Sequence, residues 1–316
     1  MGPDGSAGRP KGAPAAWAWF VGLATLDVVQ QVSDWPGPND KVTATWHEIS
    51  AGGPATNAAL AHAALGGSAR LTTGLGRGTV GEAIRGTLES RGVAVQDLAD
   101  HNAVPALSSI LLTEGTADRT IVSTDGTGMG VRIPDREADL EGCGALLVDG
   151  HHPELALWAA RQARAAGVRV IVDAGRWKPV MAELLGLADD VVCSSDFRMP
   201  GVDGPDALLA GLISRGVRRA AITRGEDSVL WAERHADGTA SGTGRLAVDT
   251  VPAVDTLGAG DVFHGAYAHA VARGGVAFAE ALRFAAEAAG ERVQVRGQVA
   301  WLERLSGFRT TETATR

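Results

Sequence analysis

The chain of 316 residues has a formal net charge of −8, is 45% hydrophobic and contains two cysteines. Its length suits one large α/β domain, its scattered Lys and Arg argue against a nucleic-acid partner, and two cysteines imply neither a disulfide framework nor a zinc site. No apolar run reaches transmembrane length and no signal-peptide pattern opens the chain, so we expect a cytoplasmic protein without membrane contact.

The N-terminal half predicts a mixture of buried and exposed elements. Residues 1–16 are rich in Gly, Pro and Ala and are expected to form a disordered tail. The remaining residues, 17–316, are expected to form a single domain. Its first elements are predicted as strands at 17–22 and 68–74 and helices at 56–65 and 79–91. Further strands at 42–50, 108–114 and 120–123 do not alternate with helices, so we expect a small separate sheet, a lid made of residues 28–50 and 107–124.

After residue 145 the pattern becomes regular. Short apolar segments at 145–148, 168–172, 190–192 and 219–223 alternate with predicted helices at 154–166, 179–185 and 205–214. An antiparallel pair at 229–232 and 245–248 and two helices at 261–273 and 277–294 follow. Apolar strands that alternate with helices predict a doubly wound parallel sheet covered on both faces. Ligands of such sheets lie beyond the carboxyl ends of the strands, where Asp27, His151, Thr223 and 258–261 are expected to converge.

The string VDTLGAGDVFHG at 254–265 is the most informative motif. Gly258 and Gly260 allow a tight turn whose amides converge, and the apolar segment 262–272 predicts a helix that begins there. A helix N-terminus binds anions, which favours a phosphate site. Asp261 beside that site would be repelled by the anion unless it accepts the proton of an attacking hydroxyl. The alternative is a plain helix start in which Asp261 only caps the turn.

The full string resembles the C-terminal signature of the ribokinase-like (PfkB-type) carbohydrate kinases, D-T-x-G-A-G-D-x-F-x-G, and fills every fixed position. The resemblance implies an α/β fold of three layers, with a mostly parallel sheet and a small antiparallel lid. It also implies an ATP-dependent kinase with Asp261 as general base and the amides of 257–260, among them those of Gly258, Ala259 and Gly260, at the transferred phosphoryl group. Asp255 would either belong to a monovalent-cation (K⁺) loop or cap the turn.

Two N-terminal strings resemble the substrate-binding segments of the same family, in particular the ketohexokinase and sulfofructose kinase branches. The segment 22–29 holds Asp27, which would bind sugar hydroxyls or, alternatively, be a loop Asp satisfied by backbone amides. The string GGPATN at 52–57 is similar to the family's G-G-N-x-x-N motif, with Pro54 in place of the first Asn. It would bring Gly53 and Asn57 to the substrate, although the string also reads as a plain helix start.

The other candidates follow from the same resemblance. Arg119 lies in a segment similar to the ketohexokinase lid hairpin and would reach phosphate or substrate, or be solvated. His151 stands where the sulfofructose branch has an Arg, which argues against a sulfonated sugar. Thr223 and Gly225 resemble a T-x-G nucleotide loop, and Ala286 matches an adenine-pocket position. No Asn-x-x-Glu motif precedes that loop, so Mg²⁺ would be held by the ATP phosphates and water.

The sequence therefore predicts phosphoryl transfer from ATP to a hydroxymethyl group of a small, ketohexose-like carbohydrate, in a homodimer formed through the lid. A nucleoside kinase is the first alternative, because Trp35 or Trp46 would supply a stacking wall for a base. A non-catalytic sugar sensor is the second. It would keep Asp27 and Asn57 but need no base at Asp261, so the intact string at 254–265 argues against it.

Overall fold

The computed structural model describes residues 17–115, 119–124, 126, 128–234 and 242–314. The predicted tail at 1–16 lies outside the described residues. Among the described residues, no helix is both long and apolar enough to cross a membrane.

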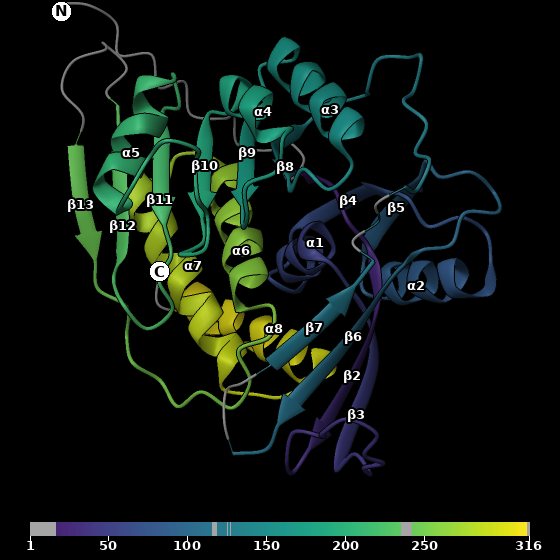
Figure 1. Cartoon of the computed structure of the whole chain (residues 1–316). Coiled ribbons are helices and arrows are strands. Elements are labelled where there is room, and N and C mark those ends of the chain that lie inside the picture. The colour runs from purple at the N-terminus through teal and green to yellow at the C-terminus, as the bar shows by residue number, and fades with distance from the viewer. Residues whose placement is uncertain (1–16, 116–118, 125, 127, 235–241, 315–316) are drawn as a thin grey trace, which may run out of the picture.

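A nine-stranded sheet forms the centre of the molecule (Figure 1). Its strands run in the order β13-β12-β11-β10-β9-β8-β1-β4-β5, and the seven from β11 to β5 are parallel. The chain starts in β1, adds β4 and β5 on one side, and then returns to add β8 to β11 on the other. This confirms the doubly wound α/β fold. The strands are β1 (Trp17–Val21), β4 (Ser68–Thr73), β5 (Val93–Asp97), β8 (Cys143–Val148), β9 (Arg169–Ala174), β10 (Asp190–Cys193), β11 (Arg219–Ile222), β12 (Val229–Glu233) and β13 (Gly242–Leu246).

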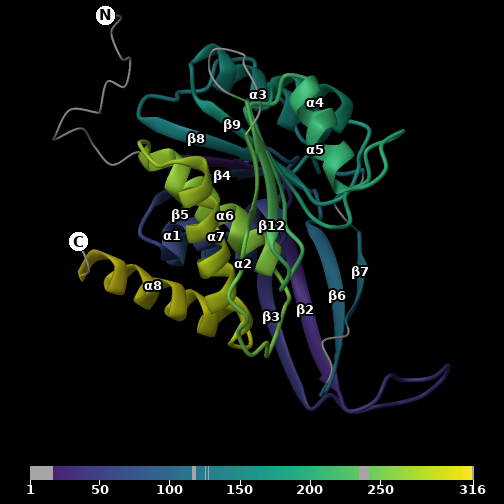
Figure 2. The same cartoon turned by 90° about the vertical axis from the view of Figure 1, so that its left-hand side faces the viewer.

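Helices cover both faces of the large sheet, giving the three layers visible in Figures 1 and 2. One buried core lies under α1, α2, α6, α7 and α8, and a second lies under α3, α4 and α5. Because each face has its own core, the strands between them are apolar on both sides, as expected for a parallel sheet. The helices are α1 (Pro54–Ala64), α2 (Thr79–Ser90), α3 (Pro153–Ala165), α4 (Met181–Leu187), α5 (Pro205–Ser214), α6 (Ala259–Arg273), α7 (Phe278–Val293) and α8 (Gln298–Ala314).

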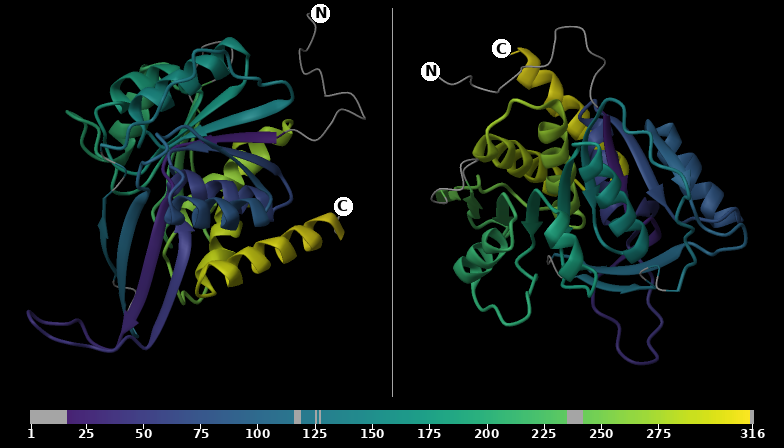
Figure 3. Two further views of the ribbon diagram at one scale, coloured as in Figure 1. Left: turned by 90° about the vertical axis from the view of Figure 1, so that its right-hand side faces the viewer. Right: turned by 90° about the horizontal axis from the view of Figure 1, so that it is seen from above.

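The predicted small sheet is present and lies apart from the large one (Figures 2 and 3). Its order is β3-β2-β6-β7. The β2–β3 and β6–β7 pairs are antiparallel, whereas β2 and β6 are parallel. The strand β2 begins four residues after β1 ends, so the small sheet starts at the carboxyl edge of the large one. The strands are β2 (Thr25–Val32), β3 (Trp46–Gly52), β6 (Ala106–Thr113) and β7 (Arg119–Ser123).

Candidate active site

A cavity of about 590 Å³ lies between the small sheet, the carboxyl ends of β8 and β9, and the first turns of α1 and α6. It is the place where segments far apart in the sequence meet. Most of the predicted site residues line it: Asp27, Gly53, Asn57, Arg119, His151, Asp255, Gly258, Ala259, Gly260 and Asp261. The expected convergence beyond the strand ends is therefore observed for these residues.

Asp261 lies in the first turn of α6 and faces this cavity. Its Oδ2 accepts a 2.8 Å hydrogen bond from Nδ2 of Asn57 on α1. Burial raises the pKa of Asp261 to about 6, and the negative charges of Asp173 and Asp27 act in the same direction, while Asn57 and His264 oppose them. A carboxyl group that titrates near pH 6 is ionised at pH 7 and still basic enough to take a proton.

The turn before α6 has the backbone of an anion site. Gly258 adopts φ 75°, which a residue with a side chain rarely does, and a Cβ added at Gly260 would meet nothing within 4 Å. Within the described residues, the amides of Gly258 and Gly260 donate to no protein acceptor, as is usual at a helix start. The prediction was wrong for Leu257, whose amide donates to Oδ1 of Asp255 at 2.9 Å. The amide of Ala259 makes a longer, 3.3 Å bond to the Thr256 carbonyl.

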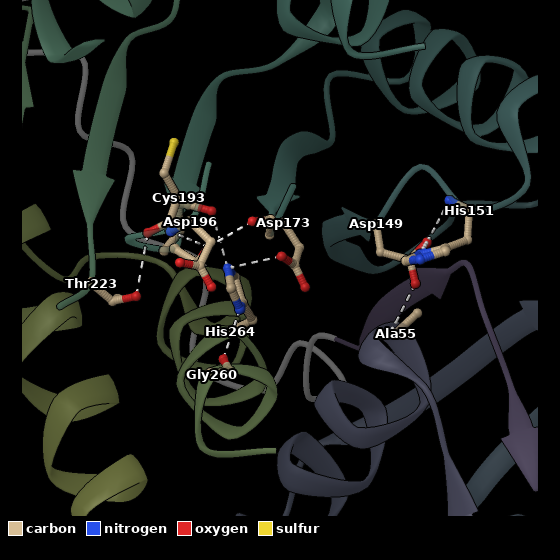
Figure 4. A network of polar contacts seen from close by, with 12 residues as sticks. Ala55, Asp149, His151, Asp173, Cys193, Asp196, Thr223, Gly260 and His264 are labelled. Atoms are coloured by element: carbon tan, nitrogen blue, oxygen red, sulfur yellow. Dashed lines mark hydrogen bonds and ion pairs between the residues drawn. The ribbon is translucent and has the colours of Figure 1, made fainter. Parts of the chain in front are cut away.

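Asp173 and His264 form a buried pair beside Asp261 that sequence reasoning missed (Figure 4). His264 Nε2 lies 3.4 Å from Asp173 Oδ1 and 3.1 Å from the Val192 carbonyl oxygen, and Nδ1 lies 2.7 Å from the Gly260 carbonyl oxygen. Carbonyl oxygens only accept hydrogen bonds, so both ring nitrogens face acceptors. The only sequence signal for Asp173 was its position directly after the apolar segment 168–172, although Asp173 in fact lies within β9.

Asp149, at the carboxyl end of β8, holds three segments together from a fully buried position (Figure 4). Its carboxylate accepts hydrogen bonds from the amides of Leu23 (2.9 Å), Ala55 (3.2 Å) and His151 (2.9 Å). Burial alone would raise the pKa of Asp149, but the charge and hydrogen bonds of His151, together with Lys178, hold it well below its usual range. Asp149 therefore orders the start of α1 and the position of His151.

The small sheet presents a polar row to the cavity. Ser50, Asp27, Ser108 and Ser123 lie side by side across its four strands, and all four line the cavity. Asp27 was expected in a loop after β1, but it lies within β2, because this segment pairs with β3 and β6. Its Oδ1 accepts a 2.5 Å bond from Thr25 Oγ1, and burial raises its pKa despite the hydrogen bonds from Thr25 and Ser108.

Gly53 and Arg119 each have a structural partner in the cavity. Gly53 precedes α1 with φ 99°, and a Cβ there would come within 2.4 Å of the Leu23 carbonyl oxygen, so the close approach requires glycine. Nη1 of Arg119, on β7, donates a 2.8 Å hydrogen bond to Oγ1 of Thr256. The small sheet thus contacts the turn that leads to α6.

The predicted nucleotide residues lie elsewhere. None of Thr223, Gly225 and Ala286, all of them described residues, lines the cavity that holds Asp261. Thr223 follows β11, and its hydroxyl donates to the Cys193 carbonyl at 3.3 Å (Figure 4). Gly225 occupies a turn with φ 63°, and Ala286 lies half-buried on α7.

Asp255 does not fit the predicted monovalent-cation site. Its Oδ2 pairs with Nη2 of Arg292 at 2.8 Å, and its Oδ1 accepts the Leu257 amide. Both carboxylate oxygens therefore have partners from the chain. Among the described residues, no cluster of three or more His, Cys, Asp or Glu side chains could hold a metal ion.

The chain is similar to known proteins over nearly its whole length. Residues 18–303 match the sequence model described as pfkB family carbohydrate kinase. The chain is 25% identical to ketohexokinase of Mus musculus over 291 residues (88% of this chain, 96% of the relative) and 27% identical to ribokinase of Arabidopsis thaliana over 320 residues (94% and 82%). A crystal structure from Agrobacterium tumefaciens, of a protein proposed to be a ribokinase, superposes with a TM-score of 0.81 at 28% identity, covering 96% of this chain and 100% of that one.

Proposed function

The chain belongs to the pfkB family of carbohydrate kinases and is an ATP-dependent kinase, and on this premise we propose that it phosphorylates a hydroxymethyl group of a small, ketohexose-like carbohydrate. The observation that carries the proposal is that Asp261, with its raised pKa, lines the same cavity as the glycine turn before α6 and the polar row that contains Asp27. One face of the cavity suits an anion and the other suits hydroxyl groups.

In the proposed reaction Asp261 accepts the proton of the acceptor hydroxyl. The hydroxyl oxygen forms a bond to the γ-phosphorus of ATP, the bond from that phosphorus to the β–γ bridging oxygen breaks, and ADP leaves. The amides of Gly258 and Gly260 and the start of α6 stabilise the negative charge of the transferred group, and each such donor contributes roughly 10²–10³ in rate. Asn57 holds the Asp261 carboxylate toward the acceptor through its 2.8 Å hydrogen bond.

We place ATP across the carboxyl ends of the strands, with its γ-phosphate at the α6 turn. Thr223, Gly225 and Ala286 would then contact the rest of the nucleotide, which their positions after β11 and on α7 support. Mg²⁺ would be bound by the phosphates and water and would neutralise charge there, in keeping with its preference for phosphate and water oxygens. The small sheet would act as a lid that excludes water from the cavity.

The side of the cavity formed by the small sheet favours a polyhydroxy acceptor. Four polar side chains in one row, with the carboxylate of Asp27 among them, suit a polyhydroxy compound. A nucleoside acceptor is the second candidate because Trp46 lines the same cavity, whereas Trp35 is 52% exposed and does not line it. The names of the two relatives above, ketohexokinase and ribokinase, indicate that those enzymes act on sugars.

A homodimer through the small sheet is part of the proposal. On the outer face of the sheet Ile49, Val28, Ser109 and Val122 lie in one row, and Leu107 lies in the next. The exposed fractions of Ile49 and Val122 are 64% and 70%, which is high for apolar side chains on one sheet face. A second copy of this chain would cover them.

The experiment is a screen of ketoses, aldoses, sugar acids and nucleosides with Mg-ATP, read as ADP release. We expect ketohexoses to be the best acceptors, and we expect Asp261→Asn to lower kcat by at least roughly 10² while ATP binding remains. Asp206→Asn is the matched control, because Asp206 is exposed and also lies in the first turn of a helix, α5. If nucleosides are the better acceptors, the proposed carbohydrate acceptor is wrong. If Asp261→Asn keeps full turnover, Asp261 is not the general base.

A further inference from the structure

We infer that the guanidinium of Arg292 takes the place of a monovalent cation at Asp255, so that this enzyme positions its phosphate-binding turn with an internal charge and needs no K⁺. The inference deepens the proposed function and rests on it, because it concerns the turn that would hold the γ-phosphate. It begins from the disagreement between the cation loop predicted at Asp255 and the partners that Asp255 has in the structure.

Arg292 lies in the last turn of α7, and its side chain is only 3% exposed. Nη2 donates to Oδ2 of Asp255 at 2.8 Å, while Nη1 donates to the carbonyl oxygens of Asp255 at 3.2 Å and Val295 at 2.9 Å. A carboxylate and two carbonyl oxygens are the kind of oxygen ligands that would bind a hard cation. Here these oxygens converge on a guanidinium, which occupies the space and supplies the positive charge.

A second positive charge at this place is unfavourable. A K⁺ ion beside Asp255 would be next to the positively charged guanidinium of Arg292. Like charges repel strongly when both are shielded from water. The pair of Asp255 and Arg292 is already electrically neutral, so a bound cation would add an uncompensated charge to a buried site.

The same pair is connected to the anion site through one residue. Asp255 Oδ1 accepts the amide of Leu257 at 2.9 Å, and Leu257 precedes Gly258, which lines the cavity. The backbone beside Arg292 adds to this link, because the Val293 carbonyl accepts the amides of Val254 at 2.7 Å and Asp255 at 3.1 Å. Arg292 is therefore a positioning residue: it fixes Asp255, and Asp255 fixes the direction of the turn.

The first test measures wild-type enzyme with and without potassium chloride, at an ionic strength kept constant with tetramethylammonium chloride. We expect kcat/KM to change by less than about twofold, and the melting temperature measured without substrates to change by less than a few degrees. A cation that does not bind cannot shift either quantity. An activation of roughly tenfold or more by K⁺, or stabilisation of the wild type by K⁺, would overturn the inference.

The second test compares Arg292→Ala with Arg283→Ala, an exposed arginine on the same helix. Arg292→Ala leaves a buried, unpaired carboxylate, so we expect a lower melting temperature and lower kcat/KM, both partly restored by K⁺. Arg283→Ala should behave as the wild type. A loss that K⁺ does not restore in folded Arg292→Ala would contradict the inference. If that variant does not fold, the K⁺ response of the wild type decides.

The melting temperatures separate this inference from the proposed function. They report cation binding without turnover, so an inactive wild type would disprove the proposed acceptor class and leave the cation result standing.

Discussion

Replacing Asn57 with Ala removes the 2.8 Å hydrogen bond from its Nδ2 to Oδ2 of Asp261. The bond stabilises the ionised form of Asp261, whose pKa burial raises to about 6. Its loss therefore raises the pKa further. Asp261 must be ionised to accept a proton, so the acid limb of the pH profile should move to higher pH.

The size of the shift follows from the strength of the bond. A hydrogen bond to a charged group contributes about 1.5–3 kcal/mol, and one pKa unit corresponds to about 1.4 kcal/mol, so the limb should move by about one to two pH units. At pH 7 the ionised fraction of Asp261 would fall from about nine tenths to between roughly a half and a tenth. Activity should therefore fall about 2- to 10-fold at pH 7 and recover near pH 9.

The assay is kcat/KM from about pH 5 to pH 9.5, which reports the pKa of the free enzyme. Asp173→Asn should move the limb in the opposite direction, because it removes a negative charge that raises the pKa of Asp261. Asn102→Ala, which changes an exposed Asn, is the matched control. An unchanged limb in Asn57→Ala, or a shift of Asn57→Ala and Asp173→Asn in the same direction, would refute the electrostatic account of Asp261.

Two further predictions concern the small sheet. Asp27→Ala should raise the KM of the acceptor about 10- to 100-fold with a smaller effect on kcat, since it removes hydrogen bonds to a carboxylate worth about 1.5–3 kcal/mol; an unchanged KM would place the acceptor elsewhere. Val122→Glu should convert the proposed dimer into monomers in sedimentation experiments, because Val122, which is 70% exposed, lies in the outer row of the small sheet and a buried unpaired carboxylate is costly. Val104, which is 78% exposed and lies outside this sheet, should tolerate the same change. A monomeric wild type would contradict the second prediction.

The sequence predicted the large sheet well because its signals are local. Short apolar strands alternate with helices, and the motif at 254–265 places Asp261 in the first turn of α6, as observed. The strands β2 and β5 and the helix α8 were missed. In β2 the polar Asp27 interrupts the apolar pattern, and the strand exists because it pairs with β3 and with β6, about 80 residues away.

The electrostatics of the candidate site could not be predicted in the same way. Asp173 and His264 are separated by 91 positions and meet only because β9 ends beside the first turns of α6. The pairing of Asp255 with Arg292, 37 positions later, likewise depends on the packing of α7 against α6. Residue types indicated which groups matter, while their ionisation and partners required the folded chain.

The contact between Arg119 and Thr256 bears on how molecules enter and leave. Every described residue of β7 is exposed, so little packing holds this edge strand down beyond its pairing with β6. A single exposed hydrogen bond contributes about 1 kcal/mol, which leaves it broken in roughly one molecule in six at any moment. The contact between β7 and the α6 turn can therefore open by side-chain rotation of Arg119 alone, which takes nanoseconds and is far faster than a typical catalytic cycle.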